Sequence, residues 1–248
     1  MYELVSFVNK LRRRWGIQTA MRKERAEAKG ARTRDSVRTQ DPEGTRRNIL
    51  EIASEEFALN GLAGARVDEI AARTRSSKRM IYYYFGDKEG LYVSALENAY
   101  RQVREGEAKL DTDGLPAVEA LRKLVEFTFD HHHHHEDFIR MVMIENIHRG
   151  EYLDRSEAIR DLNAAAIDHI AHIYARGVEE ALFRSGLDPL ELHWQISALC
   201  FFNVSNRATF SKIFGRDFGA QEALANLRRN TVDMVLRFVV RSDKMPKD

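Results

Sequence analysis

The stretch "SSKRMIYYYFGDKEGLY", residues 76–92, decides the fold, because it sets three consecutive tyrosines between basic side chains. If residues 77–85 form a helix, Ile81 and Phe85 stand one turn apart and bury the same face. Successive helical residues are about 100° apart, so the three tyrosines cannot all turn inward with them. The stretch therefore predicts a short helix whose exposed face is aromatic and basic.

The residues before this stretch predict two more helices. Asp41 is a candidate N-cap for a helix over residues 41–60, and Pro42 stands in its first turn, where a missing N–H leaves no bond unmade. Asn60, followed by a glycine, is expected to end this helix. The second helix is short, over residues 67–74. Its inward face is formed by Val67, Ile70 and Ala71.

A tight turn at residues 75–76 joins the two short helices. Two short helices joined in this way, the second of them polar and aromatic, are typical of a helix-turn-helix. Their apolar faces must bury against each other and against the first helix. The other face of residues 77–85 is then exposed. It carries Ser77, Lys78, Arg79, Tyr82 and Tyr83, with Tyr84 at its flank.

This exposed face suits DNA. Lysine and arginine neutralise phosphates or donate to guanine O6 and N7, and tyrosine hydroxyls reach phosphate oxygens. Lys88, at the start of the next helix, stands beside N-terminal N–H groups that can hold a phosphate. We therefore expect the tyrosines to contact a DNA major groove. The alternative is that the rings are core, but this accounts for only one of three consecutive residues.

The remainder of the chain predicts an all-α protein. Apolar residues recur at intervals of three and four, few segments alternate with period two, and proline is scarce. Asp87 is a candidate cap for a long helix to about residue 110, which ends before "DTDGLP" (111–116). Asp188, Pro189 and Glu191 form the start signal of a later helix. The helices after the break are expected over residues 116–134, 137–149, 157–185, 189–214 and 220–241.

The composition limits the class of protein. The 248 residues suffice for one or two domains with a real core, and no apolar run approaches the roughly 20 residues of a membrane span. With Cys200 as the single cysteine, no intramolecular disulfide is possible, and a reducing cytoplasm is expected. Glu145 and His148 have the Glu-x-x-His spacing of a helical di-metal enzyme, but no second pair accompanies them. We therefore expect no enzyme and no cofactor.

Residues 1–40 are strongly basic. They hold eleven lysines and arginines against four acidic residues, whereas the net charge of the whole chain is +1. "LVSFVNKLRRRW" (4–15) sets apolar side chains on one helical face beside a basic cluster, and this order is wrong for a signal peptide. Four alternatives stay open: a solvated flexible tail, a membrane-surface helix, an arm that enters a DNA groove, or translation that starts at Met21.

Residues 45–96 resemble the N-terminal domain of TetR/AcrR-type bacterial transcriptional regulators. The specific pieces are "ILEIASEEFALNG", "VDEIA" and "IYYYFGDKEGLY". The resemblance implies a homodimer with a three-helix head that binds a palindromic operator in double-stranded DNA. It also implies a C-terminal helical domain that binds a small organic effector and forms the dimer. We expect a regulator, most simply a repressor released by its effector; activation, the effector and the operator sequence stay open.

The resemblance divides the chain into an N-terminal extension over residues 1–40, a helix-turn-helix domain over 41–88, an effector and dimerisation domain over 89–241, and a tail over 242–248. Carried over by position, it implies ten DNA-contacting residues. They are Thr45, Arg66, Ser77, Lys78, Arg79, Met80, Tyr82, Tyr83, Tyr84 and Lys88.

The chain departs from the family pattern in and beside the turn. Arg75 and Ser76 stand where the family has a glycine and a small apolar residue, and Arg66 stands where a serine or threonine caps the second helix. Arg79 replaces a small residue. A turn without glycine is expected to be slightly strained, and the added arginines raise the positive charge near the DNA face.

The segment "FIRMVMIENIHRG" (138–150) is apolar apart from a few positions, among them Glu145 and His148, which need partners if they are buried. We expect them to pair with each other or with the effector. The resemblance places the pocket among the helices of residues 90–210. The candidates for its lining, with ordinary core as the alternative for each, are Phe127, Phe129, Met141, Glu145, His148, Phe202, Asn203 and Asn206.

The last two expected helices carry more large apolar side chains than one face of a bundle needs. Two antiparallel helices that pair with their symmetry mates would bury these side chains in a four-helix interface. The candidates for this dimer interface are Phe201, Phe210, Val232, Val235 and Leu236.

Residues 131–135 are five consecutive histidines. Histidines at i and i+4, such as His131 and His135, can share a helix face and bind zinc, which makes a metal-responsive regulator the alternative function. The simpler expectation is a solvated helix end without metal, where histidine suits the negative end of the helix dipole.

Overall fold

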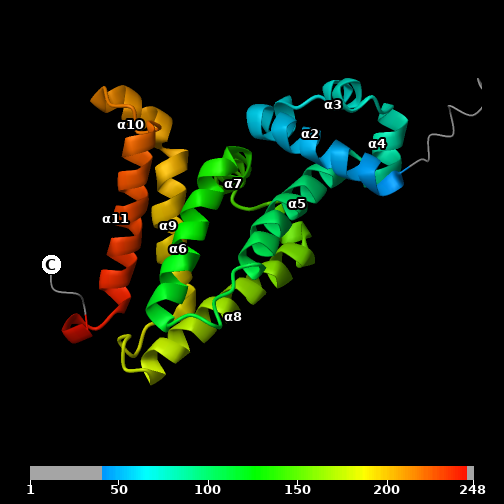
Figure 1. Cartoon of the computed structure of the whole chain (residues 1–248). Helices are drawn as coiled ribbons and strands as arrows, with labels where there is room; N and C mark the ends of the chain where they lie inside the picture. The colour runs from blue at the N-terminus through cyan, green and yellow to red at the C-terminus, as the bar shows by residue number, and fades with distance from the viewer. Residues whose placement is uncertain (1–40, 245–248) are drawn as a thin grey trace, which may run out of the picture. The chain divides into compact units, whose positions relative to one another are not determined.

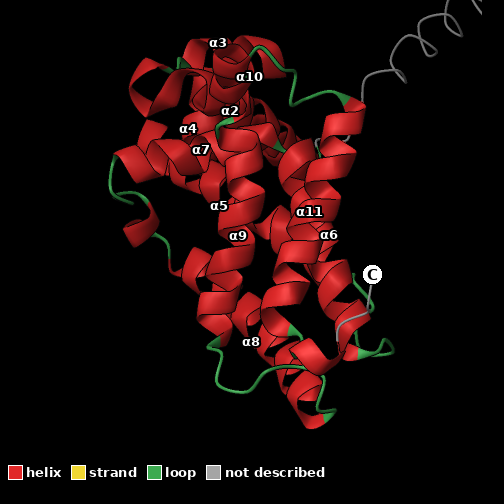
Figure 2. Ribbon diagram, turned by 90° about the vertical axis from the view of Figure 1, so that its left-hand side faces the viewer, coloured by secondary structure: helices red, strands yellow, loops and turns green. Residues whose placement is uncertain are grey.

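The structure is a computed structural model that describes residues 41–244. The predictions for the basic segment 1–40 and for Met21 lie outside the described residues. Within them the chain is helical, as predicted, and its helices are joined by loops (Figures 1 and 2). The extended contact found in this range is an isolated antiparallel bridge between Phe183 and Val240.

The first three helices form a compact head. They are α2 (Pro42–Gly64), α3 (Val67–Thr74) and α4 (Lys78–Phe85), and the long α5 (Lys88–Ala108) follows. Their inward side chains bury one apolar cluster, the head cluster, to which the first half of α5 also contributes. Its large members include Ile49, Phe57, Ile70, Ile81, Leu91, Tyr92 and Leu96, with Met141 and Ile159 from later in the chain.

The helix ends of the head follow the local sequence. Gly61 has a φ of 65°, so the regular part of α2 stops at Asn60, as the Asn-Gly pair predicted. The Ser77 hydroxyl accepts a hydrogen bond from the Met80 N–H at 3.1 Å and caps α4. Arg75 ends α3 in a left-handed conformation with a φ of 54°. The strain expected of a turn without glycine is therefore located at Arg75, at a cost of about 1 kcal/mol.

Two glycines fix the joint between α4 and α5. Gly86 has a φ of 80°, which a residue with a side chain rarely adopts. Asp87 caps α5, as predicted, by accepting the Gly90 N–H at 2.7 Å. A Cβ atom at Gly90 would lie 2.2 Å from the Phe85 carbonyl oxygen, so no side chain fits there. The backbone path from α4 to α5 therefore depends on glycine at both positions.

The later helices pack around α6 (Ala117–His134). They are α7 (Glu136–Ile147), α8 (Glu157–Glu179), α9 (Pro189–Ser205), α10 (Arg207–Phe214) and α11 (Gln221–Val239), with short 3-10 turns at Leu153–Arg155 and Ser242–Lys244. In Figure 1, α6, α9 and α11 lie side by side, and they share a second apolar cluster with α8. We call it the body cluster. Its members include Leu121, Leu124, Phe129, Ile170, Ile173, Ile196, Cys200, Val232, Val235 and Leu236.

Two of the expected helices are shorter than predicted. The helix expected over 157–185 ends at Glu179, because Ala181 has a φ of 54° and the chain turns back. Phe183 then packs its ring on Gly177, where a Cβ atom would lie 2.1 Å from the ring. The helix expected over 189–214 is two helices, since Asn206 leaves regular helical geometry at a φ of −105° and a ψ of 0°.

Within residues 41–244, no helix combines the length and the apolar character needed to cross a membrane.

Candidate nucleic-acid interface and effector cavity

The residues expected to contact DNA gather on α4 and beside it. Ile81 and Phe85 are buried, while Tyr82 is 41% and Tyr83 is 80% exposed. Tyr84 is half-buried, and its ring meets that of Tyr83 edge to face at 5.4 Å. The inward and outward residues of this helix are therefore the predicted ones.

The remaining candidates on α4 are also accessible. Arg79 and Met80 are exposed, and Ser77 caps the helix. The Lys78 ammonium forms an ion pair with Asp68 of α3 at 2.6 Å, with both side chains about half exposed. If Lys78 binds a DNA phosphate, as predicted, its ammonium would have to leave Asp68.

Three further candidates flank α4 from other elements. Lys88 begins α5, and its ammonium donates to the Ala63 carbonyl at 3.3 Å. Thr45 lies in the first turn of α2, next to Arg46, whose guanidinium stands 5.5 Å from the centre of the Phe85 ring. Arg66 is exposed just before α3. Whether these residues touch DNA stays a prediction.

A buried carboxylate replaces the missing cap of α3. The Arg66 side chain makes no cap hydrogen bond, but its N–H donates to Glu56 Oε1 at 3.0 Å. The same oxygen accepts from the Asn60 side chain at 3.0 Å. Glu56 was missed by the sequence reasoning, although its place beside Phe57 on the inward face of α2 is visible in the sequence.

A cavity of about 720 Å³ lies between α5, α6, α7, α8 and α9. We call it the α5–α9 cavity. Four aromatic side chains line it, namely those of Tyr100, Phe138, Trp194 and Phe201. Arg104, His132 and His193 contribute polar groups. A hollow of this size, in which aromatic walls meet converging polar groups, is typical of a small-molecule site.

Two polar groups of this cavity lack partners. The Arg104 guanidinium pairs with Glu107 one turn on, but its Nε is buried without a hydrogen bond, as is Nδ1 of His132. Burial, together with the nearby Arg104 charge, lowers the pKa of His132 to about 4 and also lowers that of His193. Both rings are therefore neutral near pH 7.

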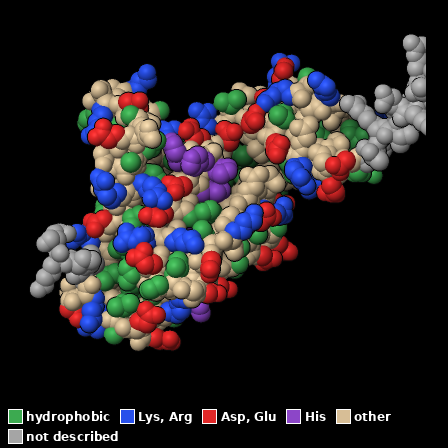
Figure 3. Space-filling model, in the orientation of Figure 1, with side chains coloured by type: hydrophobic (Ala, Val, Ile, Leu, Met, Phe, Trp, Pro, Cys, Tyr) green, Lys and Arg blue, Asp and Glu red, His purple; other side chains and the backbone are tan. Residues whose placement is uncertain are grey.

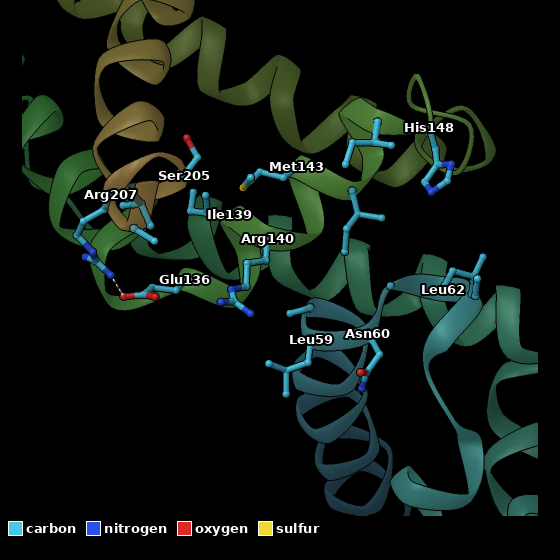
Figure 4. Close-up of a pocket in the computed structure, with 17 residues that line it drawn as sticks. Leu59, Asn60, Leu62, Glu136, Ile139, Arg140, Met143, His148, Ser205 and Arg207 are labelled. Carbon is cyan, nitrogen blue, oxygen red and sulfur yellow. Dashed lines mark hydrogen bonds and ion pairs between the residues drawn. The ribbon is translucent and has the colours of Figure 1, made fainter. Parts of the chain in front are cut away.

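A second hollow of about 550 Å³ lies between the end of α2, α7 and the junction of α9 and α10 (Figure 4). Its charged side chains are largely paired: Arg207 and Glu136 form an ion pair, drawn as a dashed line in the figure. Leu59 and Ile147 on its walls are 64% and 75% exposed. We call it the α2–α7 groove.

None of the residues predicted to line the effector pocket lines the α5–α9 cavity. Phe129 belongs to the body cluster and Met141 to the head cluster. His148 lines the α2–α7 groove, whereas Phe202 and Asn203 line a third hollow between α9 and α11. Phe127 packs beside the His131 ring, and Asn206 separates α9 from α10.

Glu145 is buried, but its partner is not His148. Its Oε1 accepts from the Tyr92 hydroxyl at 2.8 Å, and its Oε2 accepts from the N–H groups of Tyr152 and Leu153 at 3.2 and 3.3 Å. The expected pairing of Glu145 with His148 is therefore wrong, since His148 is exposed at the end of α7. The carboxylate instead ties the loop before α8 to the head cluster.

Three of the five dimer candidates are not available to a partner. Val232, Val235 and Leu236 are buried in the chain's own body cluster, which corrects that prediction. Phe201 is half-buried on the α5–α9 cavity. Phe210 is exposed. The other exposed large apolar side chains of α9, α10 and α11 are Leu190, Trp194, Phe202, Ile213, Phe214, Met234 and Phe238.

The histidine run is only in part the solvated helix end that the sequence predicted, since His134 and His135 are exposed at the end of α6. Histidine side chains gather on one patch in Figure 3, but His131 and His132 are buried. The rings of His131 and His135 stack at 3.9 Å, and both nitrogens of His131 lack partners. Among residues 41–244, no group of three or more His, Cys, Asp or Glu side chains is arranged to hold a metal ion.

The sequence reasoning missed most of the cavity residues. Tyr100 and Arg104 are four residues apart on α5, as are His193 and Ser197 on α9, so each pair shares a helix face. This spacing was the sequence feature that could have indicated these residues. It does not reveal that these faces of α5 and α9 meet at one cavity, because that depends on how five helices pack.

Comparison with known proteins agrees with this architecture. Residues 49–95 match the model of the tetR family of bacterial regulatory proteins, and residues 118–235 match a tetracyclin repressor-like C-terminal domain. The chain is 35% identical over 201 residues to the HTH-type transcriptional repressor NicS of Pseudomonas putida, which covers 81% of this chain and 95% of the relative.

Solved structures show the same fold. The regulator FadR of Bacillus subtilis, in complex with stearoyl-CoA, superposes with a TM-score of 0.62 at 18% identity, over 77% of this chain and 98% of that one. The ketosteroid transcriptional regulator KstR2 of Mycobacterium tuberculosis has a TM-score of 0.58 at 20% identity, over 79% and 95%. From the helix-turn-helix, the C-terminal bundle and these matches, we conclude that the chain belongs to the TetR family of transcriptional regulators.

Proposed function

We propose that this protein is a dimeric repressor that binds a palindromic operator in the bacterial cytoplasm and leaves it when a small organic molecule fills the α5–α9 cavity. The observation that carries the proposal is the outward face of α4. There the exposed rings of Tyr82 and Tyr83 stand beside Lys78 and Arg79 on a helix anchored by Ile81 and Phe85. The similarity to NicS, which is named a repressor, supports repression over activation.

A dimer would explain the apolar surface of the last helices. Phe202, Phe214, Met234 and Phe238 are each about half exposed or more, and they lie on α9, α10 and α11. Exposed apolar patches of this kind are typical of interaction sites. A two-fold interface built from these helices would present two α4 helices to DNA. Binding to successive major grooves requires them to be about 34–36 Å apart.

The loop between α7 and α8 supplies a route from cavity to head. Leu153 lines the cavity, and its N–H is bound by Glu145, which also binds Tyr92 of α5. Arg155, two residues on, pairs with Glu89 in the first turn of α5 at 2.6 Å. A ligand that displaces Leu153 therefore acts on the helix that carries α4. A ligand that fits only the displaced arrangement shifts the population away from DNA binding.

The solved FadR complex supports a ligand-binding role for this fold, since it holds stearoyl-CoA. The sequence identity of 18% does not transfer that ligand to this chain. The α5–α9 cavity is the better candidate site than the α2–α7 groove. Its unpartnered polar atoms leave bonds for a ligand to make, whereas Arg207 and Glu136 of the groove already bind each other.

The test is a footprint of the purified protein on DNA from upstream of its own gene, at several salt concentrations. We expect two protected half-sites and a loss of protection in a Lys78→Ala/Tyr82→Ala/Tyr83→Ala variant. The matched control is Arg122→Ala on α6, whose partly exposed side chain pairs with Glu119 in the same helix. Equal protection by the triple variant and the wild type would refute the DNA-contact role of α4.

A second measurement tests the regulation. Any effector that weakens operator binding must itself bind more weakly in the presence of operator, by the same factor. Titration of effector with and without operator DNA checks this equality. An effector whose affinity is unchanged by operator would contradict the proposed release mechanism.

A further inference from the structure

The α5–α9 cavity also indicates what kind of effector it takes, an inference that rests on the proposed function. We propose that the effector is a small organic anion, a carboxylate carried on a flat unsaturated body, and that Arg104 binds the carboxylate. The vacant hydrogen bonds of the cavity, its charge, the guanidinium of Arg104 and the aromatic walls each point to such a ligand.

The vacant hydrogen bonds point to a polar ligand group. Buried polar atoms of proteins are nearly always partnered, and each exception calls for an explanation. The Nε of Arg104 and the Nδ1 of His132 are buried exceptions, and both residues line the same cavity from neighbouring helices. A ligand that binds between them would supply the missing partners.

The positive charge of the cavity comes from arginine. His132 and His193 are neutral, so they donate or accept hydrogen bonds without adding charge. Arg104 is half-buried, while Arg160 and Asp154 stand exposed on the wall and carry opposite charges. Glu107 occupies one side of the Arg104 guanidinium but does not line the cavity, so two arginines face one aspartate on the lining. A site with this residual positive field favours an anion over its neutral analogue.

The guanidinium chemistry selects a carboxylate. An arginine offers a planar fork of N–H donors that matches the two oxygens of a carboxylate. Nη1 of Arg104 is bound to Glu107, but its Nε–H has no partner and is left to donate to a ligand oxygen. His193 and Ser197, four residues apart on α9, lie on the same lining and offer further polar contacts.

The aromatic walls of the cavity favour a ligand with a flat body. Tyr100 and Phe138 meet edge to face at 5.2 Å, and Trp194 and Phe201 line the cavity from α9. Aromatic walls favour offset stacking and edge contacts with a second ring system. The cavity volume of about 720 Å³ leaves room for one or two rings with the carboxylate.

The experiment compares acids with their own amides, which have the same shape but no charge. Benzoate, cinnamate and indole-3-acetate are titrated calorimetrically into the full-length protein at pH 7 without DNA, each beside its primary amide. We expect at least one acid to bind at least ten-fold more tightly than its amide.

The same titrations are run on an Arg104→Gln/Glu107→Gln variant. Removing both members of the ion pair avoids leaving an unpaired buried carboxylate. The matched control is Glu119→Gln/Arg122→Gln, an exposed pair with the same i, i+3 spacing on α6. We expect the preference for the acid to disappear in the first variant and to persist in the control, with both variants retaining the helical circular dichroism of the wild type.

The outcomes separate this inference from the proposed function. If no acid binds, or if acid and amide bind equally, the anion inference is wrong even when the footprint on DNA is intact. An acid preference that survives in the Arg104→Gln/Glu107→Gln variant rules out Arg104 as the carboxylate ligand. A protein that gives no footprint but retains the acid preference would instead refute the proposed repressor function.

Discussion

The buried polar groups of the head and those of the α5–α9 cavity differ in one respect. In and around the head cluster, Glu56, Thr74 and Glu145 all form hydrogen bonds, the last of them to three donors. Along the cavity, Arg104 Nε and His132 Nδ1 have no partner. The neighbouring His131 has none at either nitrogen.

This difference separates a region with one arrangement from a region that can accept another. A buried polar group with all its bonds made holds its neighbours in place, because moving them leaves a desolvated donor or acceptor. A buried group without a partner loses nothing when its surroundings shift, and it gains when a ligand supplies the bond. The head is therefore suited to present α4 rigidly, and the cavity is suited to respond.

Among the tests of this comparison, we expect the largest effect from Glu145→Ala. The change leaves the Tyr92 hydroxyl and the N–H groups of Tyr152 and Leu153 without an acceptor. We expect the free energy of unfolding to fall by about 3–5 kcal/mol. Urea denaturation at a fixed protein concentration measures it. The control is Glu151→Ala, which breaks only an exposed ion pair with Arg155 and should cost under about 1 kcal/mol. Equal losses in the two variants would contradict the role of the Glu145 network.

The second test is the pH dependence of stability, which should arise from the region around the cavity. The pKa of His131 is lowered to about 3 and that of His132 to about 4, chiefly by burial. In the unfolded chain both titrate near pH 6.5. As the pH falls below about 6.5, the unfolded chain takes up protons that the folded protein does not, and stability is lost.

We expect a loss of roughly 2–4 kcal/mol between pH 7 and pH 5 from the two histidines together. Urea denaturation at pH 7, 6 and 5 measures it. In a His131→Phe/His132→Phe variant the loss should be much smaller, and the stability at pH 7 should be unchanged or higher. A variant with the same pH profile as the wild type would show that these histidines are not the unpartnered groups described above.

The third test returns to the head. Glu56→Ala removes the acceptor of the Arg66 N–H and of the Asn60 side chain, and we expect a loss of about 1–3 kcal/mol. Glu56→Gln keeps one oxygen as an acceptor and should lose less. Thermal unfolding followed by circular dichroism compares the two with Glu51→Ala, an exposed change on the same helix. A loss no greater than that of Glu51→Ala would mean that Glu56 does not cap α3.

We expect the smallest effect on stability at Arg75, where the backbone of the head is strained. Arg75→Gly relieves a left-handed conformation with a φ of 54° and should raise the free energy of unfolding by up to about 1 kcal/mol. Arg79→Gly, in regular helix, should lower it by about 1 kcal/mol. Chemical denaturation of both variants shows whether the signs are opposite. Destabilisation by both would place no strain at Arg75.

The head could be predicted from the sequence because its signals are local. Ile81 and Phe85 define the inward face of α4, and the ends of α3 fall at the predicted residues, Val67 and Thr74. Caps, an Asn-Gly pair and a four-residue apolar spacing act within one helix turn. The DNA contacts themselves stay predictions, since nothing in the described chain shows a partner.

The body could be predicted only in outline. Val232, Val235 and Leu236 share a face of α11, but the spacing does not tell whether that face meets the chain's own α6 or a second copy. His132 continues the inward stripe of α6 from Leu124 and Phe129. We expected it to be solvated because histidine suits the negative end of the helix dipole. The cavity required the packing of five helices, which no single stretch of sequence contains.

The joint between α4 and α5 has a mechanical consequence. Because Ile81 and Phe85 of α4 are buried in the same cluster as Leu91 of α5, we expect the two helices to move together. The part of α5 from Lys88 to Arg104 is about 24 Å long at 1.5 Å per residue. If α5 tilts by about 5° about Arg104, its Lys88 end moves by about 2 Å. In the proposed two-fold dimer the two displacements would add, so a small adjustment at Arg104 would give the two α4 helices a spacing that no longer matches one turn of the double helix.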